Sequence, residues 1–422
     1  GLLECSADPA LLQAVLLRAL APRQALLTVP RESLFSASEL LFLPPRAEAA
    51  DLPATDLRQA PGKPVDYTGY ICAILKLTRL CNLRCSYCKD WSDDAASTMA
   101  VPLLAQLVAQ LLAGPYRGID LILHGGEPLM AGRRRLLQLL WLIARHIREG
   151  QVVNIHLQSN GTLIDRRWTA WLRLMRIRVS VSLDGPRHLH DGVRPDALGR
   201  SSYDRAIRGI ELLRQAGLLS GVLIVVSPAI LDLGPQALVA FLRERRIFSV
   251  ALIPERPGPG SPPVVRAGEF VDFLIGFHRA QQDGGPPVHA REIEAVRNLL
   301  AGRASGFCEL AGNCVGHFIT VEADGAVSHC DKYVGEPDYV LGNLTRQPLS
   351  QILQGGTVSA LRQQVAVESA ALGACRHRHL CLGWCPHERF SRRRSAPADA
   401  GCCGLAPLFD ALSHDARREA RP

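Results

Sequence analysis

Three cysteines in one short stretch are the residues whose type and spacing first suggest chemistry. The segment CNLRCSYCKDW at 81–91 spaces Cys81, Cys85 and Cys88 as C-x3-C-x2-C, and the next cysteine is Cys308. Zinc normally takes four ligands, often from two C-x2-C pairs. A [4Fe-4S] cluster that is held by three thiolates leaves one iron open for a substrate or cofactor. The spacing therefore favours such a cluster, with zinc as the alternative.

A second group of cysteines lies in the C-terminal part of the chain. Its members are Cys308, Cys314, Cys330, Cys375, Cys381, Cys385, Cys402 and Cys403. The start of the chain lacks a basic segment followed by a cleavage site, so we expect the cytoplasm. Clustered thiols in a reducing compartment indicate metal binding or catalysis, not disulfides. The isolated Cys5 and Cys72 are typical of small buried apolar residues.

Composition excludes two classes of partner. The longest apolar run, at 136–144, is well short of the roughly 18 residues of a membrane span. The net charge is +8, but aromatic content is only 5% and basic residues do not alternate with aromatic ones, as they do on surfaces that stack bases. We expect neither a membrane nor a nucleic-acid partner. We interpret the basic run at 388–395 as solvated surface, with contact to an acidic peptide or a nucleic acid as the alternative.

Strand and helix patterns alternate between about residues 71 and 285. The β-rich runs lie at 71–77, 119–124, 152–158, 178–183, 221–227 and 248–254. Amphipathic stretches with helical spacing separate them. Repeated βα units imply a parallel sheet, so the predicted fold class is α/β, a partial (β/α)6 TIM-like barrel with a C-terminal cysteine-rich auxiliary domain. The predicted domains are an arm at 1–68, the barrel at 69–285 and the auxiliary domain at 286–422.

Polar, turn-forming loops follow the first four predicted strands. They carry the cysteine trio, then HGGEP at 124–128, QSNGT at 158–162 and SLDGP at 182–186. The glycine pair allows a backbone to approach a ligand closely. Because a barrel builds its site from the loops at the C-terminal ends of its strands, these loops should meet.

In this order, the motifs closely resemble those of the radical S-adenosylmethionine (radical SAM) enzymes over about residues 70–255. The resemblance implies that Cys81, Cys85 and Cys88 hold a [4Fe-4S] cluster whose open iron binds the amino and carboxylate groups of S-adenosylmethionine. The residues that it assigns to the cofactor are Tyr87 before the third cysteine, Gly125, Gly126 and Glu127 at the amino end, and Ser182 and Arg205.

The second cysteine group resembles the SPASM auxiliary-cluster domain over 308–409. The resemblance implies a complete first auxiliary [4Fe-4S] cluster, held by Cys308, Cys314, Cys330 and Cys385. A second cluster would take Cys375, Cys381 and Cys403. It is one ligand short, because Leu372 stands where the pattern has a cysteine. Cys402 could supply that ligand, or the second site stays open or empty.

Asp331 directly follows Cys330, and this Cys-Asp pair resembles sulfatase-maturating enzymes and related peptide modifiers. The resemblance assigns Asp331 as the base that takes a proton from the substrate radical. We expect burial and thiolate charge to raise its pKa. The alternative is a hydrogen-bonding partner of a cluster ligand.

The resemblance implies cleavage of S-adenosylmethionine to a 5'-deoxyadenosyl radical, hydrogen abstraction from a peptide and a net two-electron oxidation. His124 stands where we expect glutamine before GGEP in sulfatase maturases, which favours a maturase of ribosomal precursor peptides that forms a cyclophane-type cross-link. The alternatives are a formylglycine-generating sulfatase maturase and, distantly, a zinc-ribbon nucleic-acid-binding protein. The expected partners are the precursor peptide and an electron donor such as flavodoxin or ferredoxin.

The N-terminal segment lies outside the resemblance. Residues 9–20 have a helical pattern and 44–64 that of a linker. We interpret this segment as a packing arm and not as a domain that recognises a peptide.

Overall fold

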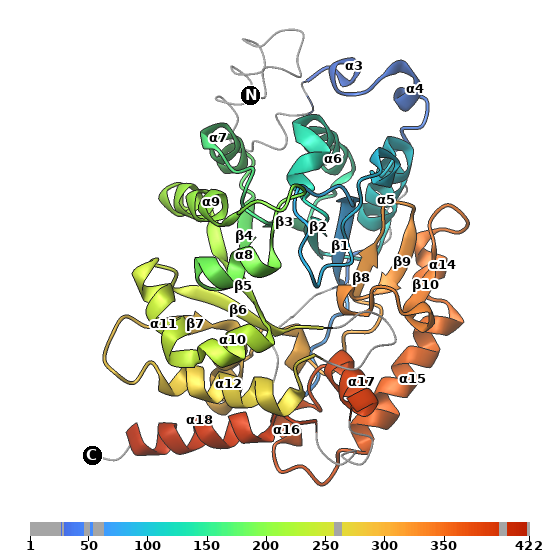
Figure 1. The fold of residues 1–422 in the computed structure, drawn as a ribbon. Helices are drawn as coiled ribbons and strands as arrows, with labels where there is room; N and C mark the ends of the chain where they lie inside the picture. Colours follow the sequence, from blue (N-terminus) through green and yellow to red (C-terminus); the bar gives the residue numbers. More distant parts are fainter. Residues whose placement is uncertain are drawn as a thin grey trace.

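One continuous sheet organises the molecule (Figure 1). The computed structural model describes residue 27 and residues 29–45, 51–53, 63–256, 264–395 and 403–419. Within these residues the strand order is β10-β9-β8-β1-β2-β3-β4-β5-β6-β7. The strands are β1(Tyr70–Thr78), β2(Gly118–Gly125), β3(Val152–Ser159), β4(Arg178–Ser182), β5(Leu219–Val226), β6(Ser249–Pro254), β7(His289–Ala290), β8(Phe318–Val321), β9(Ala326–His329) and β10(Val340–Asn343).

The central strands form the predicted partial barrel. Each of β1 to β6 pairs in parallel with the next, and every β-rich run that the sequence indicated overlaps one of them. The helices between them and before them are α3(Arg31–Leu34), α4(Ala37–Leu40), α5(Val101–Ala113), α6(Gly132–His146), α7(Arg166–Leu174), α8(Arg187–Val193), α9(Tyr203–Gln215), α10(Pro228–Leu233) and α11(Pro235–Glu244). The prediction of an α/β fold with a parallel sheet is confirmed.

The strand β1 lies at the centre because nearly all of its residues are apolar and buried on both faces, as is usual for parallel strands. By contrast, β3 alternates buried and exposed residues and so packs one face on the core. The long helix α6 is buried along most of its length. Because β1 to β4 pair in parallel in this order, their carboxyl ends lie side by side at one edge of the sheet.

The C-terminal domain extends the barrel sheet, which the sequence did not predict. The strand β8 pairs in parallel with β1, from Cys72 opposite Phe318 to Leu75 opposite Val321. Strands β9 and β10 then continue the sheet in antiparallel order. Glu322, which follows β8, is thereby carried toward the carboxyl end of β1, whereas β9 runs back and its last residue, His329, lies opposite Ile319.

The remaining helices follow β6 along the chain, and those labelled in Figure 1 lie in its lower part and along its right side. They are α12(Ala267–Arg279), α13(Arg291–Leu300), α14(Leu349–Leu353), α15(Gly356–Ala370), α16(Arg378–Cys381), α17(Pro386–Ser395) and α18(Ala406–Glu419). The helix α18 returns to α12, where His278 Nε2 lies 2.9 Å from Asp415 Oδ2. None of the helices in the described ranges is long and apolar enough to cross a bilayer.

The described part of the N-terminal segment packs on α6. Gln138 Nε2 donates a 2.7 Å hydrogen bond to the Leu34 carbonyl, and the rings of Phe35 and Trp141 meet edge to face at 5.3 Å. The helix expected at 9–20 and most of the expected linker lie outside the described residues. The interpretation of the whole segment 1–68 as an arm stays a prediction.

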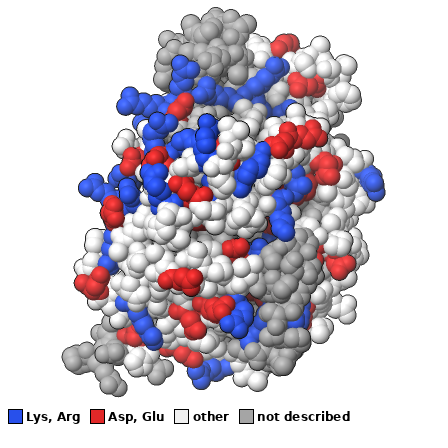
Figure 2. All heavy atoms as spheres, in the orientation of Figure 1, with Lys and Arg blue, Asp and Glu red and all other residues white. Residues whose placement is uncertain are grey.

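The interpretation of 388–395 as solvated surface is wrong for its first residues. Glu388 and Arg389 are buried, because α17 packs its first turn against the cysteine-rich domain. Farther along, Arg393 is partly exposed and pairs with Glu368. On the face drawn in Figure 2, acidic side chains lie among the basic ones, so the net charge is not concentrated in one basic stripe there.

A close contact between two glycines seats α9 against the loop after β3. A Cβ on Gly209 would lie 2.2 Å from the Gly161 carbonyl oxygen, whereas a Cβ on Gly192 in α8 would meet nothing within 4 Å. We expect Gly209→Ala to destabilise the protein by about 1–3 kcal/mol, because the helix must move away. Thermal unfolding measures this, with Gly192→Ala as the matched control. Equal melting temperatures for the two variants would contradict the prediction.

Candidate active site

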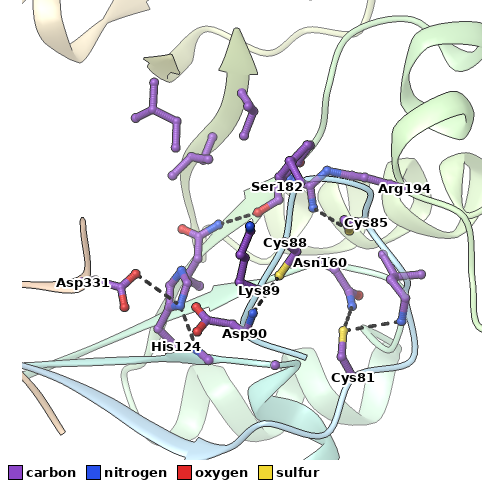
Figure 3. A pocket seen from close by; sticks show the side chains of 18 of the residues that line it. Cys81, Cys85, Cys88, Lys89, Asp90, His124, Asn160, Ser182, Arg194 and Asp331 are labelled. Atoms are coloured by element: carbon purple, nitrogen blue, oxygen red, sulfur yellow. Dashed lines mark hydrogen bonds and ion pairs between the residues drawn. The ribbon is translucent and has the colours of Figure 1, made fainter. Parts of the chain in front are cut away.

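A cavity of about 260 Å³ opens at the carboxyl ends of the barrel strands (Figure 3). One part of its lining is polar and contains thiols, glycine backbone and hydrogen-bonding side chains; another part is apolar. The polar part includes Cys81, Cys85, Cys88, Tyr87, Gly125, Gly126, Gln158, Ser159, Asn160, Ser182 and Arg194. The apolar part includes Leu223, Val225 and Ile253, and nearby lie His124, Arg256 and Asp331.

The structure brings the three predicted thiols to this cavity, and each faces N–H donors. The Leu83 amide lies 3.4 Å from Cys81 Sγ and the Asp90 amide 3.4 Å from Cys88 Sγ. Burial raises the pKa of the Cys81 thiol to about 12, so a metal must displace its proton. Thiols surrounded by N–H donors suit the negative charge of a thiolate-bound cluster.

The glycines of HGGEP bring two loops into direct contact. Gly125 has φ +111°, and a Cβ on Gly126 would lie 2.3 Å from the Leu80 carbonyl oxygen. The Gly126 amide donates to the Thr78 carbonyl at 3.1 Å. Only glycine permits this approach, so the loop after β2 presses against the cysteine loop and its backbone faces the cavity.

Glu127 does not line the cavity, contrary to the expectation of cofactor contact. It is fully buried and accepts hydrogen bonds from Ser159 Oγ at 3.0 Å and from the Asn160 amide at 2.8 Å. Its carboxyl group therefore ties the loop after β2 to the loop after β3. Burial raises its pKa from 4.5 to about 7. We infer that Glu127 positions the loops and that the glycine backbone meets the ligand.

Ser182 lies in the cavity as predicted and accepts a 2.9 Å hydrogen bond from Gln158 Nε2. Arg205 is not among the lining residues; its guanidinium lies 3.1 Å from Asp196 Oδ2 and is partly exposed. Two arginines line the cavity, Arg194 and Arg256, and Arg194 is the one beside the cysteine trio, with NH1 3.8 Å from Cys85 Sγ. The geometry therefore favours Arg194 over Arg205.

Arg194 is held by Asp184, a buried residue that the sequence motifs did not assign to the site. Its Nε donates to Asp184 Oδ2 at 2.7 Å, and its guanidinium carbon lies 5.5 Å from the centre of the Tyr87 ring. Its NH1 also lies 3.8 Å from Cys85 Sγ. The segment SLDGPRHLHDGVRPD contains both Asp184 and Arg194, so its charges could have indicated the pair.

A buried ammonium at the end of β1 was also missed, because Lys76 lies within the apolar run ICAILKL. Its side chain is 0% exposed, and Nζ lies 2.6 Å from Asp90, 3.1 Å from Glu322 and 3.0 Å from Asp331. Burial lowers the pKa of Lys76, but the carboxylates raise it above its ordinary value.

The expected rise in the pKa of Asp331 is wrong. Burial raises it, but the charges of Lys76 and His124 outweigh burial, and the pKa is lowered. His124 Nδ1 lies 3.9 Å from Asp331 Oδ2. In Figure 3 the two side chains face each other on one side of the cavity. Asp331 is thus a carboxylate at neutral pH that reaches the cavity from the auxiliary domain.

The four thiols expected to hold the first auxiliary cluster also lie together. Burial first, and then Cys385, Cys330 and Cys308, raise the pKa of Cys314. Cys330 has φ +58°, a backbone conformation that is uncommon for residues other than glycine and is often found at functional sites. The donor set fits a thiolate-bound cluster.

Three of the remaining thiols gather near α16. Cys403 hydrogen-bonds to Cys381 and lowers its pKa, and Cys375 is close enough to act on the same group. Leu372 is 3% exposed and packs over Gly383, where a Cβ would lie 3.1 Å from its Cδ1. Cys402 lies outside the described residues, so its ligand role stays a prediction.

Comparisons with known proteins agree with this arrangement. Residues 75–238 match the Radical SAM superfamily, and residues 313–381 match SPASM, an iron-sulfur cluster-binding domain. The chain is 30% identical over 318 residues to the serine-type anaerobic sulfatase-maturating enzyme of Klebsiella aerogenes, covering 72% of this chain and 77% of that enzyme. It is 26% identical to the cysteine-type enzyme of Clostridium perfringens, covering 75% of this chain and 88% of that one.

Two solved structures share the fold. Native anSMEcpe with bound AdoMet and Kp18Cys peptide superposes with a TM-score of 0.70 at 22% identity, over 82% of this chain and 97% of that one. Streptococcus suis SuiB bound to precursor peptide SuiA superposes with a TM-score of 0.55 at 13% identity, over 88% and 90%.

The raised pKa of Glu127 predicts a pH dependence. Between its ordinary value of 4.5 and about 7, the unfolded carboxyl loses its proton while the folded one keeps it. The free energy of unfolding therefore falls as pH rises through this window, by up to about 3 kcal/mol. We expect Glu127→Gln, compared with the exposed Glu211→Gln, to flatten the pH profile of the melting temperature. Parallel profiles for Glu127→Gln and the unsubstituted protein would contradict this.

Proposed function

Because the chain belongs to the radical SAM superfamily, carries a SPASM domain and is homologous to the anaerobic sulfatase-maturating enzymes, we propose that it oxidises a peptide side chain by two electrons. The observation that carries the proposal is the shared cavity. The cysteine trio and Asp331 of the auxiliary domain line the same space. A substrate held there meets both domains at once.

The residues present fit the cofactors that these domains imply, S-adenosylmethionine and [4Fe-4S] clusters. Cys81, Cys85 and Cys88 would hold the cluster with the open iron, since each sulfur already faces an N–H donor. The backbone of Gly125 and Gly126, with Ser182, Arg194 and Tyr87, would receive S-adenosylmethionine. When bound, these groups would supply a 5'-deoxyadenosyl radical that removes a hydrogen atom, and an auxiliary cluster would accept the second electron.

Asp331 would take up the proton that leaves the substrate. The ammonium of Lys76, 3.0 Å away, keeps it ionised, and a base must be unprotonated before it can act. His124, 3.9 Å away on the cavity side, would hold the carboxylate toward the substrate. One hydrogen atom, one proton and one further electron together complete a two-electron oxidation.

We propose an intrapeptide cross-link of the cyclophane type in a ribosomal precursor peptide as the product. Two features support it. His124 lines the cavity at the position where we expect glutamine in sulfatase maturases, and it faces the proposed base. Leu223, Val225 and Ile253 give the cavity an apolar wall against which a ring can pack.

Sulfatase maturation, the oxidation of a serine or cysteine to formylglycine, is the second candidate. The observation that favours it is the similarity over most of their length to enzymes of that name. An electron donor such as flavodoxin or ferredoxin completes either scheme. We further propose that the functional units are the arm at 1–68, the barrel at 69–285 and the auxiliary domain at 286–422.

If Arg194 receives S-adenosylmethionine, its loss should weaken cofactor binding by about tenfold or more, the equivalent of 1.4 kcal/mol. Equilibrium dialysis with labelled S-adenosylmethionine would compare Arg194→Lys and Arg194→Met with Arg205→Met, each at equal iron content. We expect Arg205→Met to bind as the unsubstituted protein does. Loss of binding in Arg205→Met alone would restore the original assignment.

If Asp331 is the base, Asp331→Asn should still form 5'-deoxyadenosine while losing about 10²- to 10⁴-fold in product. Glu322→Gln is the matched control, because it removes another partner of Lys76 that does not line the cavity. Both variants are assayed anaerobically with dithionite. Equal product from Asp331→Asn and Glu322→Gln would contradict the role.

The product itself is identified by mass spectrometry. The substrates are a sulfatase peptide with its target serine or cysteine and, if a short open reading frame lies beside the gene, the peptide that it encodes. A cross-link removes two hydrogen atoms and blocks fragmentation between the joined residues, whereas formylglycine reacts with a hydrazine probe. Aldehyde formation on the sulfatase peptide alone would establish the second candidate, and 5'-deoxyadenosine without either product would overturn both.

A further inference from the structure

A buried lysine touches one of the thiols of the first auxiliary set. Lys332 lies in the short helix η6(Asp331–Tyr333), directly after Asp331. Its Nζ lies 3.7 Å from Cys385 Sγ and 3.1 Å from Glu388 Oε1, and it also contacts Glu309 Oε1. The proposed function leaves this ammonium unused.

The charges around Lys332 are balanced, so its position is well determined. Glu388 also pairs with Arg256, which lines the cavity, and Glu309 accepts a 3.0 Å hydrogen bond from Trp384 Nε1. Two cations therefore face two buried carboxylates. Among the described residues Glu309 is ion-paired only with Lys332, so removal of the ammonium would leave that buried carboxylate unpaired, and the ammonium is held beside the sulfur.

A charged N–H donor on a ligand sulfur has a defined effect on an iron-sulfur cluster. It draws electron density from the thiolate and stabilises the extra negative charge of the reduced state, so it raises the reduction potential. The donor is cationic here, and hydrogen bonds with an ionised partner are about twice as strong as neutral ones.

We propose that Lys332 is a positioning residue that raises the reduction potential of the first auxiliary cluster by donating an N–H···S hydrogen bond to Cys385. The inference rests on the proposed function, in which Cys308, Cys314, Cys330 and Cys385 hold that cluster. A higher potential makes the cluster a better acceptor for the electron that leaves the substrate. Lys332 directly follows Asp331, so one turn carries both the proposed base and the residue that would set the reduction potential of the electron-accepting cluster.

The test uses a substitution that keeps the buried charge balanced. Lys332→Met/Glu309→Gln removes one cation and one carboxylate, and Glu309→Gln alone is the matched control that keeps Lys332. Both are made in the full chain with Cys81→Ala/Cys85→Ala/Cys88→Ala, so that the auxiliary signals remain. We expect the double variant to have a reduction equilibrium constant at least about tenfold lower than the control in an EPR-monitored titration, 59 mV for one electron. Coinciding potentials would overturn the inference.

A spectroscopic measurement keeps the inference testable even if the double variant does not assemble. The chain has four lysines, Lys63, Lys76, Lys89 and Lys332. With ζ-¹⁵N-lysine, ENDOR of the reduced first auxiliary cluster should show a coupled ¹⁵N that Lys332→Arg abolishes. Absence of that coupling, or its persistence in Lys332→Arg, would overturn the inference.

Iron content separates this failure from failure of the proposed function. The ligand assignment is wrong if the chain with Lys332 intact binds no auxiliary iron. It is also wrong if that chain binds auxiliary iron and Cys385→Ala removes none of it. If it binds iron that Cys385→Ala removes, but shows neither the potential difference nor the ¹⁵N coupling, only the role of Lys332 is wrong.

Discussion

The ammonium of Lys76 is the interaction on which the arrangement of this molecule depends. An unpaired charge in a protein interior costs several kcal/mol, so a lysine that is fully buried at the end of a central strand requires partners. Its partners come from three places: Asp90 after the cysteine loop, Glu322 after β8 and Asp331 after β9. Their convergence fixes the cysteine loop and the auxiliary domain relative to the end of β1.

Close backbone packing, like the ion pairs, holds the loops of the site together. The glycine pair lets the loop after β2 touch the cysteine loop, and the buried carboxyl group of Glu127 joins it to the loop after β3. Both the glycine contact and the Glu127 hydrogen bond involve backbone atoms, so they fix the three loops relative to one another. Preorganisation of this kind suits radical chemistry, in which the reacting carbon must be held close and water kept out.

The auxiliary domain has two roles in this arrangement. Its strands extend the barrel sheet through β8, and its first turn after β9 places Cys330, Asp331 and Lys332 in sequence. In the proposed chemistry these neighbours serve as cluster ligand, base and control of the electron acceptor. Proton and electron removal would thus be governed within one helical turn. Arg256 and Glu388 connect that turn to the cavity.

The sequence by itself determined the βα order, the cysteine spacings and the loops that carry the chemistry, because these follow from periodicity and local motifs. It also placed Ser182 and the glycines at the cavity. It did not identify Lys76, Arg194 or Lys332 as site residues, and it misplaced Arg205 and the direction of the pKa shift of Asp331. Those properties depend on which charges meet after folding. Lys76 and Glu322 are 246 positions apart in the chain but 3.1 Å apart in space. Local pattern carries no information about such pairs, so only the tertiary structure decided them.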